Sequence, residues 1–142
     1  MGIIRNISQN NLVFVVDDNK VYRELIGAKI EMLPNVQVEI FESAEEALKE
    51  QHRQPKLILL DLYLDGENPN ALSGHKAIEK FSEVENPPKI ILISGDYNYE
   101  LLKEYTSFRN LDHVLKSELS NKVLEQKVSA ALLVEPVEVE DK

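Results

Sequence analysis

Short apolar runs alternate along the chain with stretches in which apolar residues recur every three or four positions. The runs have the length of β-strands, and the periodic stretches are typical of helices with one buried face. A chain in which strands and helices follow each other in this way favours an α/β domain built on a parallel sheet. The expected strands are residues 12–16, 36–41, 56–60, 89–93 and 112–115.

Five helices are expected to follow the strands. Pro34 ends the first, because proline has no N–H for the helical hydrogen-bond pattern. Ser43 and Glu46 form a capping box, in which each side chain satisfies a free backbone N–H at the start of the second helix. Ser117 is placed to cap the last helix. The expected ranges are 19–33, 43–51, 74–84, 97–107 and 117–133.

Elements of this kind suit a doubly wound five-stranded parallel sheet with strand order 2-1-3-4-5. The 142 residues fit one domain of ordinary size, which we expect at 11–133. Residues 1–10 are then an N-terminal extension. Residues 134–142 are acidic and contain Pro136, and we expect them to be a disordered tail.

Composition narrows the classes of partner. Sixteen basic and twenty-five acidic residues give a net charge of -9, which opposes binding to the phosphates of nucleic acid. The chain has no cysteine, so it offers neither a disulfide nor a thiolate zinc site and is compatible with a reducing cytoplasm. No apolar stretch approaches the roughly 20 residues of a membrane-spanning helix. We therefore expect a cytoplasmic protein that binds neither nucleic acid nor membrane.

Two of the apolar runs end at acidic residues. The first strand runs into Asp17 and Asp18, and the third runs into Asp61. In the expected sheet these strands are neighbours, so their carboxyl ends bring three carboxylates into the ligand crevice of the fold. At about 4 Å and an effective dielectric near 20, each pair of like charges costs on the order of 4 kcal/mol. Such a cluster is expected to hold a cation.

Polar residues also follow the other two strands of the predicted core. Ser94 ends the fourth strand, and Lys116 follows the fifth. Taken singly, each residue has an ordinary explanation: a serine after a strand is commonly part of a turn, a lysine is commonly a surface charge, and an aspartate can cap a helix. Their placement at four strand ends of one sheet favours a common site.

Together, Asp17, Asp18, Asp61, Ser94 and Lys116 resemble the signature of the response-regulator receiver domain of two-component signalling. The resemblance covers nearly the whole chain. It implies a flavodoxin-like (CheY-like) α/β fold with the five-stranded sheet and five helices expected above. It also implies a single-domain member of a phosphorelay, because no output module is expected after the last helix.

The resemblance gives these residues their roles. Asp61 would be the phosphoacceptor, which takes a phosphoryl group from a sensor histidine kinase or a phosphotransfer protein. Lys116 would neutralise the oxygens of the transferred group. Mg²⁺, which prefers oxygen ligands and is often shared with a phosphate, would be held by Asp17, Asp18, Asp61 and the backbone carbonyl of Tyr63.

A switch is also implied by the resemblance. Ser94 would donate its hydroxyl to the phosphoryl group, and a side chain on the fifth strand would move in response. That position is His113 here, where the family commonly has tyrosine or phenylalanine, and a histidine can also charge near neutral pH or serve only structure. Ser117 stands where a proline usually follows the lysine, so we expect a trans peptide bond. Two interpretations of the long loop at 62–73 stay open: it contacts a partner protein, or it is a tolerated surface insertion.

Three functions are weighed. The leading one is a receiver that signals through an unknown downstream protein, with homodimer formation left open. The alternative is a phosphorylation-independent protein-binding module of receiver fold. An independent enzyme is least favoured, because the chain has no glycine-rich phosphate loop and Asp61 and Asp65 lack the Asp-x-Asp spacing of haloacid-dehalogenase phosphatases. The protein would assist only its own phosphorylation and dephosphorylation.

Overall fold

The computed structural model describes residues 11–61, 74–94 and 111–132. Five strands form one sheet in which every neighbouring pair is parallel, in the order β2-β1-β3-β4-β5. This order confirms the prediction, and each strand lies within one residue of its expected ends. The strands are β1 (Asn11–Val16), β2 (Val36–Phe41), β3 (Leu57–Asp61), β4 (Lys89–Ser94) and β5 (Leu111–Leu115).

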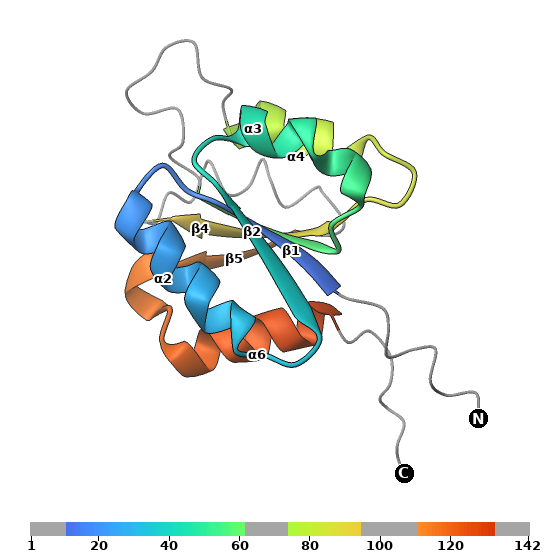
Figure 1. The fold of residues 1–142 in the computed structure, drawn as a ribbon. Coiled ribbons are helices and arrows are strands. Elements are labelled where there is room, and N and C mark those ends of the chain that lie inside the picture. Colours follow the sequence, from blue (N-terminus) through green and yellow to red (C-terminus); the bar gives the residue numbers. More distant parts are fainter. Residues whose placement is uncertain (1–10, 62–73, 95–110, 133–142) are drawn as a thin grey trace, which may run out of the picture.

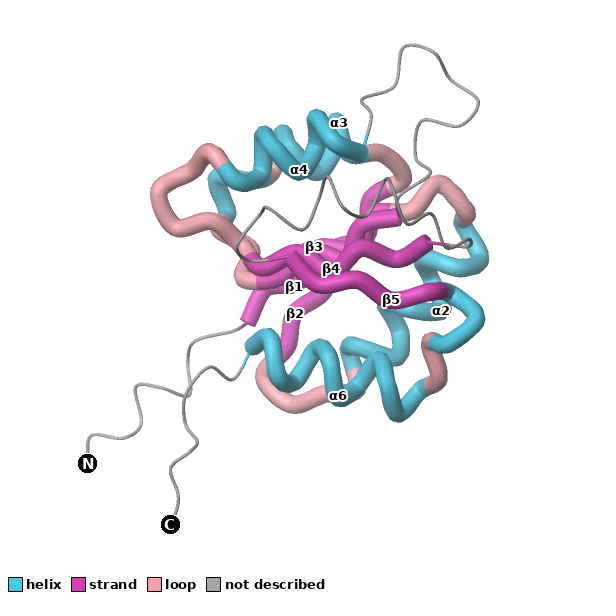
Figure 2. Tube along the Cα trace, turned by 180° about the vertical axis from the view of Figure 1, so that it is seen from behind, coloured by secondary structure: helices cyan, strands magenta, loops and turns pink. Residues whose placement is uncertain are grey.

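Helices cover both faces of the sheet, as expected for a doubly wound fold (Figures 1 and 2). On one face lie α2 (Lys20–Glu31) and α6 (Asn121–Leu132), and on the other lie α3 (Ala44–Lys49) and α4 (Gly74–Ser82). Two short 3-10 turns, η1 (Gln51–Arg53) and η2 (Lys116–Glu118), complete the described elements. The helix expected at 97–107 lies outside the described residues, as do the terminal segments 1–10 and 133–142.

Burial on both faces explains why the central strands are continuous apolar runs. Because side chains alternate along a strand, Phe14 and Val16 of β1 face the core shared with α3 and α4. Val13 and Val15 face the other core, which contains residues of α2 and α6 such as Ile30 and Val128. β1 and β3 are thereby fixed in register, with Val16 opposite Leu60.

The ends of α2 and α3 follow from local hydrogen bonds. The side chain of Asn19 accepts the backbone N–H of Tyr22 at 3.0 Å and caps α2. Ser43 Oγ accepts the backbone N–H of Glu46 at 3.2 Å, which confirms one of the two hydrogen bonds of the predicted capping box. Within α2, a Cβ at Gly27 would lie 3.0 Å from Ile40 Cγ2, so this glycine permits the close approach of α2 to β2.

The predicted start of the last helix at Ser117 is wrong. Ser117 belongs to the turn η2, and Leu119 then leaves the helical conformation with φ -88° and ψ 80°. Ser120 caps α6 instead: its Oγ accepts the backbone N–H of Val123 at 3.1 Å. The physical reason is that Leu119 packs against the core beside α2 and α6, which places the helix start after it. The described residues contain no cis peptide bond, which confirms the expected trans bond before Ser117.

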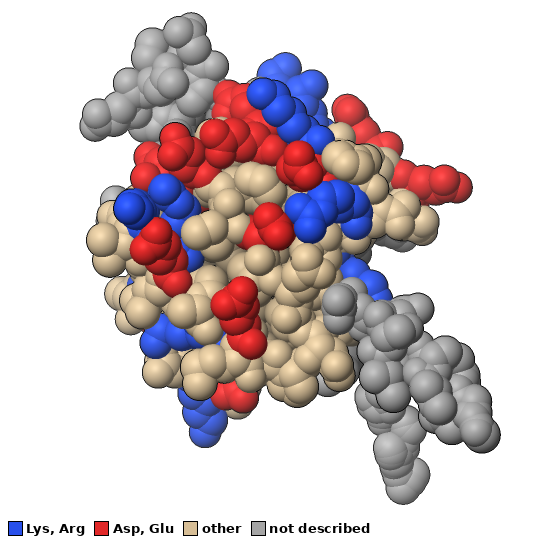
Figure 3. Space-filling view, viewed as in Figure 1, with Lys and Arg blue, Asp and Glu red and all other residues tan. Residues whose placement is uncertain are grey.

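Acidic side chains gather near α3 on the face shown in Figure 3, with lysine and arginine side chains interspersed. This face therefore carries no continuous basic surface of the kind that binds nucleic acid. Among the described helices, none has both the length and the apolar character needed to cross a membrane.

Candidate functional site

Three carboxylates meet at the carboxyl ends of β1 and β3. Because Val16 lies opposite Leu60, the residues that follow in each strand direction, Asp17 and Asp61, stand side by side. Asp17 is 3% exposed and Asp61 is 4% exposed, whereas Asp18 is exposed to solvent. One carboxylate oxygen from each of the three lies within 4.8 Å of the others. The prediction that these acids share one crevice is confirmed.

Asp17 is held in place by its own backbone and by the start of α2. Its Oδ1 accepts the backbone N–H of Asn19 at 2.9 Å, and its backbone N–H donates to the carbonyl of Phe41 at 3.1 Å. Arg23 Nη1 donates to the carbonyl oxygen of Asp17 at 3.2 Å, and Arg23 also pairs with Glu42 at 3.7 Å. These contacts fix the carboxylate of Asp17. Its second oxygen, Oδ2, faces the ammonium of Lys116.

Lys116 reaches into the crevice from the end of β5. Its Nζ lies 3.7 Å from Asp17 Oδ2 and 3.8 Å from Asp61 Oδ2. Both distances exceed the roughly 2.7–2.9 Å of a short charge-assisted hydrogen bond, so the ammonium acts on both acids mainly through its charge. Among the described side chains, one lysine lies against the three carboxylates, so the cluster keeps a surplus of negative charge.

Tyr22 is a site residue that sequence analysis missed. The Lys116 Nζ lies 4.4 Å from the centroid of the Tyr22 ring, within the range of a cation–π interaction. Burial raises the pKa of the Tyr22 phenol above its ordinary value, and the charges of Asp17 and Asp61 raise it further. The ring therefore remains neutral at physiological pH. The sequence placed Tyr22 in the first helical turn after Asp17 and Asp18, which could have pointed to the site. Its apolar helical spacing instead suggested a core residue.

The donor set of the crevice fits a hard divalent cation. Asp17, Asp18 and Asp61 offer carboxylate oxygens, and the described residues bring no histidine or cysteine ligand to them. Oxygen ligands in an open, acidic crevice suit Mg²⁺ better than zinc, which favours nitrogen and sulfur. A bound cation would offset the surplus negative charge that Lys116 leaves.

The remaining predicted site residues are placed only in part. Ser94 lies at the end of β4, at the same edge of the sheet, and pairs with Leu115 of β5. The side chain of Ser94 is not among the parts of the chain that the structure describes. Tyr63 and its carbonyl lie outside the described residues. His113 lies on β5 and is half-buried.

The environment of His113 favours its neutral form. Burial lowers the pKa of the imidazole, and the charge of Lys127 lowers it further, while the charges of Asp112 and Glu118 raise it. The net result is a pKa below the ordinary value of 6.5. Lys127 Nζ and Asp112 Oδ2 are themselves paired at 2.8 Å.

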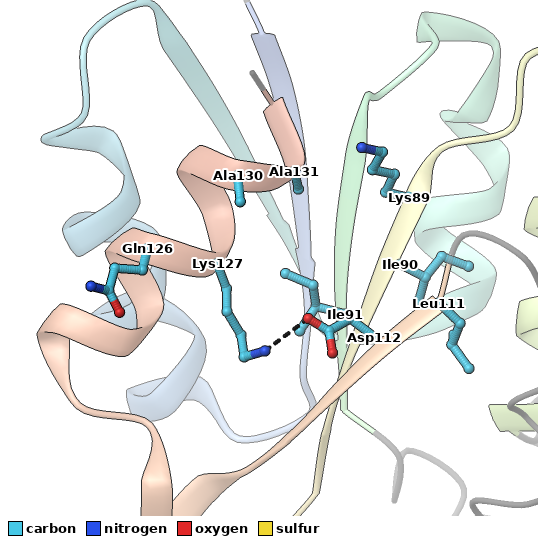
Figure 4. A pocket seen from close by; sticks show the side chains of 9 residues that line it. All are labelled: Lys89, Ile90, Ile91, Leu111, Asp112, Gln126, Lys127, Ala130 and Ala131. Carbon is cyan, nitrogen blue, oxygen red and sulfur yellow. Dashed lines mark hydrogen bonds and ion pairs between the residues drawn. The ribbon is translucent and has the colours of Figure 1, made fainter. Parts of the chain in front are cut away.

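A hollow of about 520 Å³ lies elsewhere, between the first residues of β4 and β5 and the helix α6 (Figure 4). Lys89, Leu111 and Ala131 are among its lining residues, and the Asp112–Lys127 pair crosses it. Strand direction places this hollow at the amino ends of the strands, whereas the acids stand at the carboxyl ends. It takes no part in the acidic crevice.

Comparison with known proteins bears on both the fold and the crevice. A family model described as the response regulator receiver domain matches residues 13–129. The receiver domain of NtrX from Brucella abortus is similar, with a TM-score of 0.73 and 22% identity over 87% of this chain and 99% of that chain. The response regulator domain of CheB from Thermotoga maritima matches with a TM-score of 0.72 and 23% identity over 89% of this chain and 99% of that chain. No curated protein sequence matches the chain.

The family match extends from β1 into α6 and includes Asp17, Asp18, Asp61 and Lys116, which the fold brings into one crevice. The solved structures share the fold at low identity. The chain therefore belongs to the response regulator receiver domain family.

Proposed function

We propose that this protein is the phosphoacceptor of a two-component phosphorelay and that Asp61 receives the phosphoryl group. The observation that carries the proposal is the buried carboxylate of Asp61 at the end of β3, with two further acids within 4.8 Å and the Lys116 ammonium at 3.8 Å. Sensor histidine kinases or phosphotransfer proteins are the proposed donors. A downstream protein binds according to whether Asp61 carries the phosphoryl group.

The chemistry needs little more than position and charge. An oxygen of Asp61 attacks phosphorus in line with the leaving group and forms a new P–O bond. The P–N bond of a phosphohistidine, or the P–O bond of an acyl phosphate, breaks, and its electron pair leaves with the nitrogen or oxygen. Lys116 then faces the transferred group, whose oxygens carry the charge that this ammonium stabilises.

Mg²⁺ is the proposed cofactor of this step. Asp17, Asp18 and Asp61 would hold it, together with the backbone carbonyl of Tyr63. When bound, it supplies positive charge beside the phosphoryl oxygens and offsets the repulsion that these oxygens meet from the acids. Asp18 is exposed to solvent, so its carboxylate is accessible to an incoming ion.

The output is proposed to run through Ser94 and His113. A phosphoryl group on Asp61 adds negative charge at the edge of the sheet where β4 and β5 also end. Capture of that charge by the Ser94 hydroxyl would draw the end of β4 toward the crevice, and His113 would shift on β5. A change of charge at one atom then alters a surface that a partner protein reads.

Intact-mass measurement tests the assignment of Asp61. Wild type, Asp61→Asn and Asp112→Asn are incubated with acetyl phosphate and Mg²⁺, with a second set in excess chelator. We expect the mass of one phosphoryl group on the wild type and on Asp112→Asn, which removes an exposed acid far from the crevice, and none on Asp61→Asn. A wild type that gains no phosphate contradicts the proposal.

A phosphorylation-independent binding module of the same fold is the second candidate. It is favoured by two departures from the family pattern, His113 at the switch position and Ser117 after the lysine. It predicts the same affinity for a partner with and without phosphate on Asp61. Independent enzyme activity is not proposed. Multiple turnover of a generic phosphate ester would support it.

A further inference from the structure

Three groups from three elements surround the Lys116 ammonium. Asp17 follows β1, Asp61 ends β3, and Tyr22 lies in the first turn of α2. The Nζ atom lies 3.7 and 3.8 Å from the carboxylate oxygens and 4.4 Å from the centroid of the tyrosine ring. The helix cap fixes the backbone that carries this ring, because the Tyr22 backbone N–H donates to Asn19 Oδ1 at 3.0 Å.

The two carboxylates alone leave the position of the ammonium loosely defined. Neither distance is that of a short charge-assisted hydrogen bond. The lysine stem has four rotatable carbon–carbon bonds and high rotamer entropy, and 29% of the Lys116 side chain is exposed. A flexible cation under two weak attractions can leave the crevice for solvent unless a third group restrains it.

The tyrosine ring supplies that restraint without competing for hydrogen bonds. Its face attracts a cation through the ring quadrupole, but it offers no strong acceptor for the ammonium N–H groups. Those donors therefore stay available for phosphoryl oxygens. A carboxylate in the place of Tyr22 would hold the ammonium more strongly, but it would add negative charge to a crevice that must admit a phosphoryl group.

We infer that Tyr22 is a positioning residue, which holds the Lys116 ammonium over the phosphoacceptor Asp61 so that it meets the incoming phosphoryl group. This inference rests on the proposed function for its consequence in phosphorylation. The contact between Tyr22 and Lys116 is a property of the folded chain and can be measured without any donor. The two parts are therefore tested separately.

The first test is a double-mutant cycle of thermal unfolding in the absence of Mg²⁺ and phosphodonor. It compares the wild type, Tyr22→Leu, Lys116→Met and the double variant, since leucine keeps apolar bulk and methionine keeps the length of the stem. We expect the two losses to be non-additive by about 2–4 °C, the size of a partly buried cation–π contact in a domain of this length. If the changes in unfolding midpoint of the two single variants add up to that of the double variant, the inference is wrong.

The second test repeats the cycle on the rate of phosphorylation by acetyl phosphate with Mg²⁺. Tyr22→Leu should slow the reaction roughly fivefold when Lys116 is present and have no effect in the Lys116→Met background. Tyr22→Phe should restore the rate, because the ring face remains. An equal loss from Tyr22→Leu in both backgrounds would mean that tyrosine only supports the fold, and the inference would be wrong.

Val21→Leu is the matched control on the neighbouring residue of α2, whose side chain is 75% exposed and makes no part of the crevice. It should leave both the midpoint and the rate unchanged. The two proposals fail differently. A wild type that takes no phosphate removes the proposed function, whereas additive unfolding midpoints remove the role of Tyr22 even if Asp61 is phosphorylated.

Discussion

The Lys116 ammonium lies 3.8 Å from Asp61 Oδ2, although Lys116 follows β5, Asp61 ends β3, and these two strands are not neighbours. β4 separates β5 from β3, so the lysine side chain reaches over the end of β4 to meet the acid. The same Nζ lies 3.7 Å from Asp17 Oδ2. In the metal-free protein the Lys116 ammonium thus interacts with two buried carboxylates. It would compete with a metal ion for the same oxygens.

Replacing Lys116 by methionine should therefore separate metal binding from phosphorylation. Removal of a positive charge less than 4 Å from both acids makes the crevice more attractive to a divalent cation. We expect Mg²⁺ to bind Lys116→Met roughly three- to tenfold more tightly, after allowance for solvent screening of a partly exposed lysine. Phosphorylation should nevertheless be slower, because the phosphoryl oxygens lose their cation.

Isothermal titration with Mg²⁺ measures the first effect, and intact mass against time with acetyl phosphate measures the second. Lys116→Arg is the matched control, since it keeps the charge. It should bind Mg²⁺ with an affinity close to that of the wild type. Equal Mg²⁺ affinity for Lys116→Met and the wild type would show that the ammonium does not oppose the metal.

Asp18 should be the acid whose removal most clearly stabilises the metal-free protein. It is exposed, and no hydrogen bond or ion pair within the described residues involves its side chain, yet its oxygen lies within 4.8 Å of the other two carboxylates. Asp18→Asn relieves that repulsion, which we expect to raise the free energy of unfolding by about 0.5–1 kcal/mol without Mg²⁺. The same change removes a metal ligand, so stabilisation by Mg²⁺ should fall.

Urea unfolding at low and high Mg²⁺ checks both halves of this expectation. Glu125→Gln removes an exposed acid on α6, away from the crevice, and controls for the general effect of net charge. It should retain the full stabilisation by Mg²⁺. A metal-free Asp18→Asn that is no more stable than the control would contradict mutual repulsion among the three acids.

The fold and the main acids could be predicted because each depends on short-range patterns. Runs that are buried on both faces of a sheet must be apolar at every position, and β1 and β3 meet this requirement. Parallel strands then bring their carboxyl ends to one edge, so residues that follow the runs meet there. The place of Asp17 beside Asp61 needed no further information than strand order.

The ring of Tyr22 and the cap of α6 could not be predicted in the same way. Tyr22 has the helical spacing of a core residue, and that spacing does not show that its ring lies 4.4 Å from the Nζ of Lys116, a residue far away in the sequence. Ser117 and Ser120 both suit a helix start by residue type. The choice between them depends on Leu119, which must pack against the core before the helix can begin.

The two serines provide a direct test of where α6 begins. Ser120 Oγ accepts the backbone N–H of Val123 at 3.1 Å, so Ser120→Ala leaves a helix-terminal donor without this partner. We expect a loss of about 1 kcal/mol in the free energy of unfolding. Ser117→Ala is the matched control and should change stability by less than about 0.5 kcal/mol, as for surface substitutions in general. Similar losses for both would contradict the observed cap.

His113 makes stability depend on pH in a direction that its surroundings fix. Its pKa in the folded protein lies below the ordinary 6.5, chiefly because of burial. The unfolded chain therefore binds the proton more readily than the folded one. Neutral His113 adds no penalty above pH 6.5, and stability falls as pH drops from 6.5 through the lowered pKa.

Lys127→Met should weaken this pH dependence. Lys127 lowers the pKa of His113 by its charge, and it pairs with Asp112 at 2.8 Å, so its loss leaves the Asp112 charge uncompensated beside the imidazole. Both changes favour the protonated ring and raise its pKa toward the unfolded value. An NMR titration of His113 measures the pKa, and urea unfolding between pH 5.5 and 7.5 measures the stability. His113→Gln should remove this part of the pH dependence. A lower pKa of His113 in Lys127→Met than in the wild type would contradict the role given to the Lys127 charge.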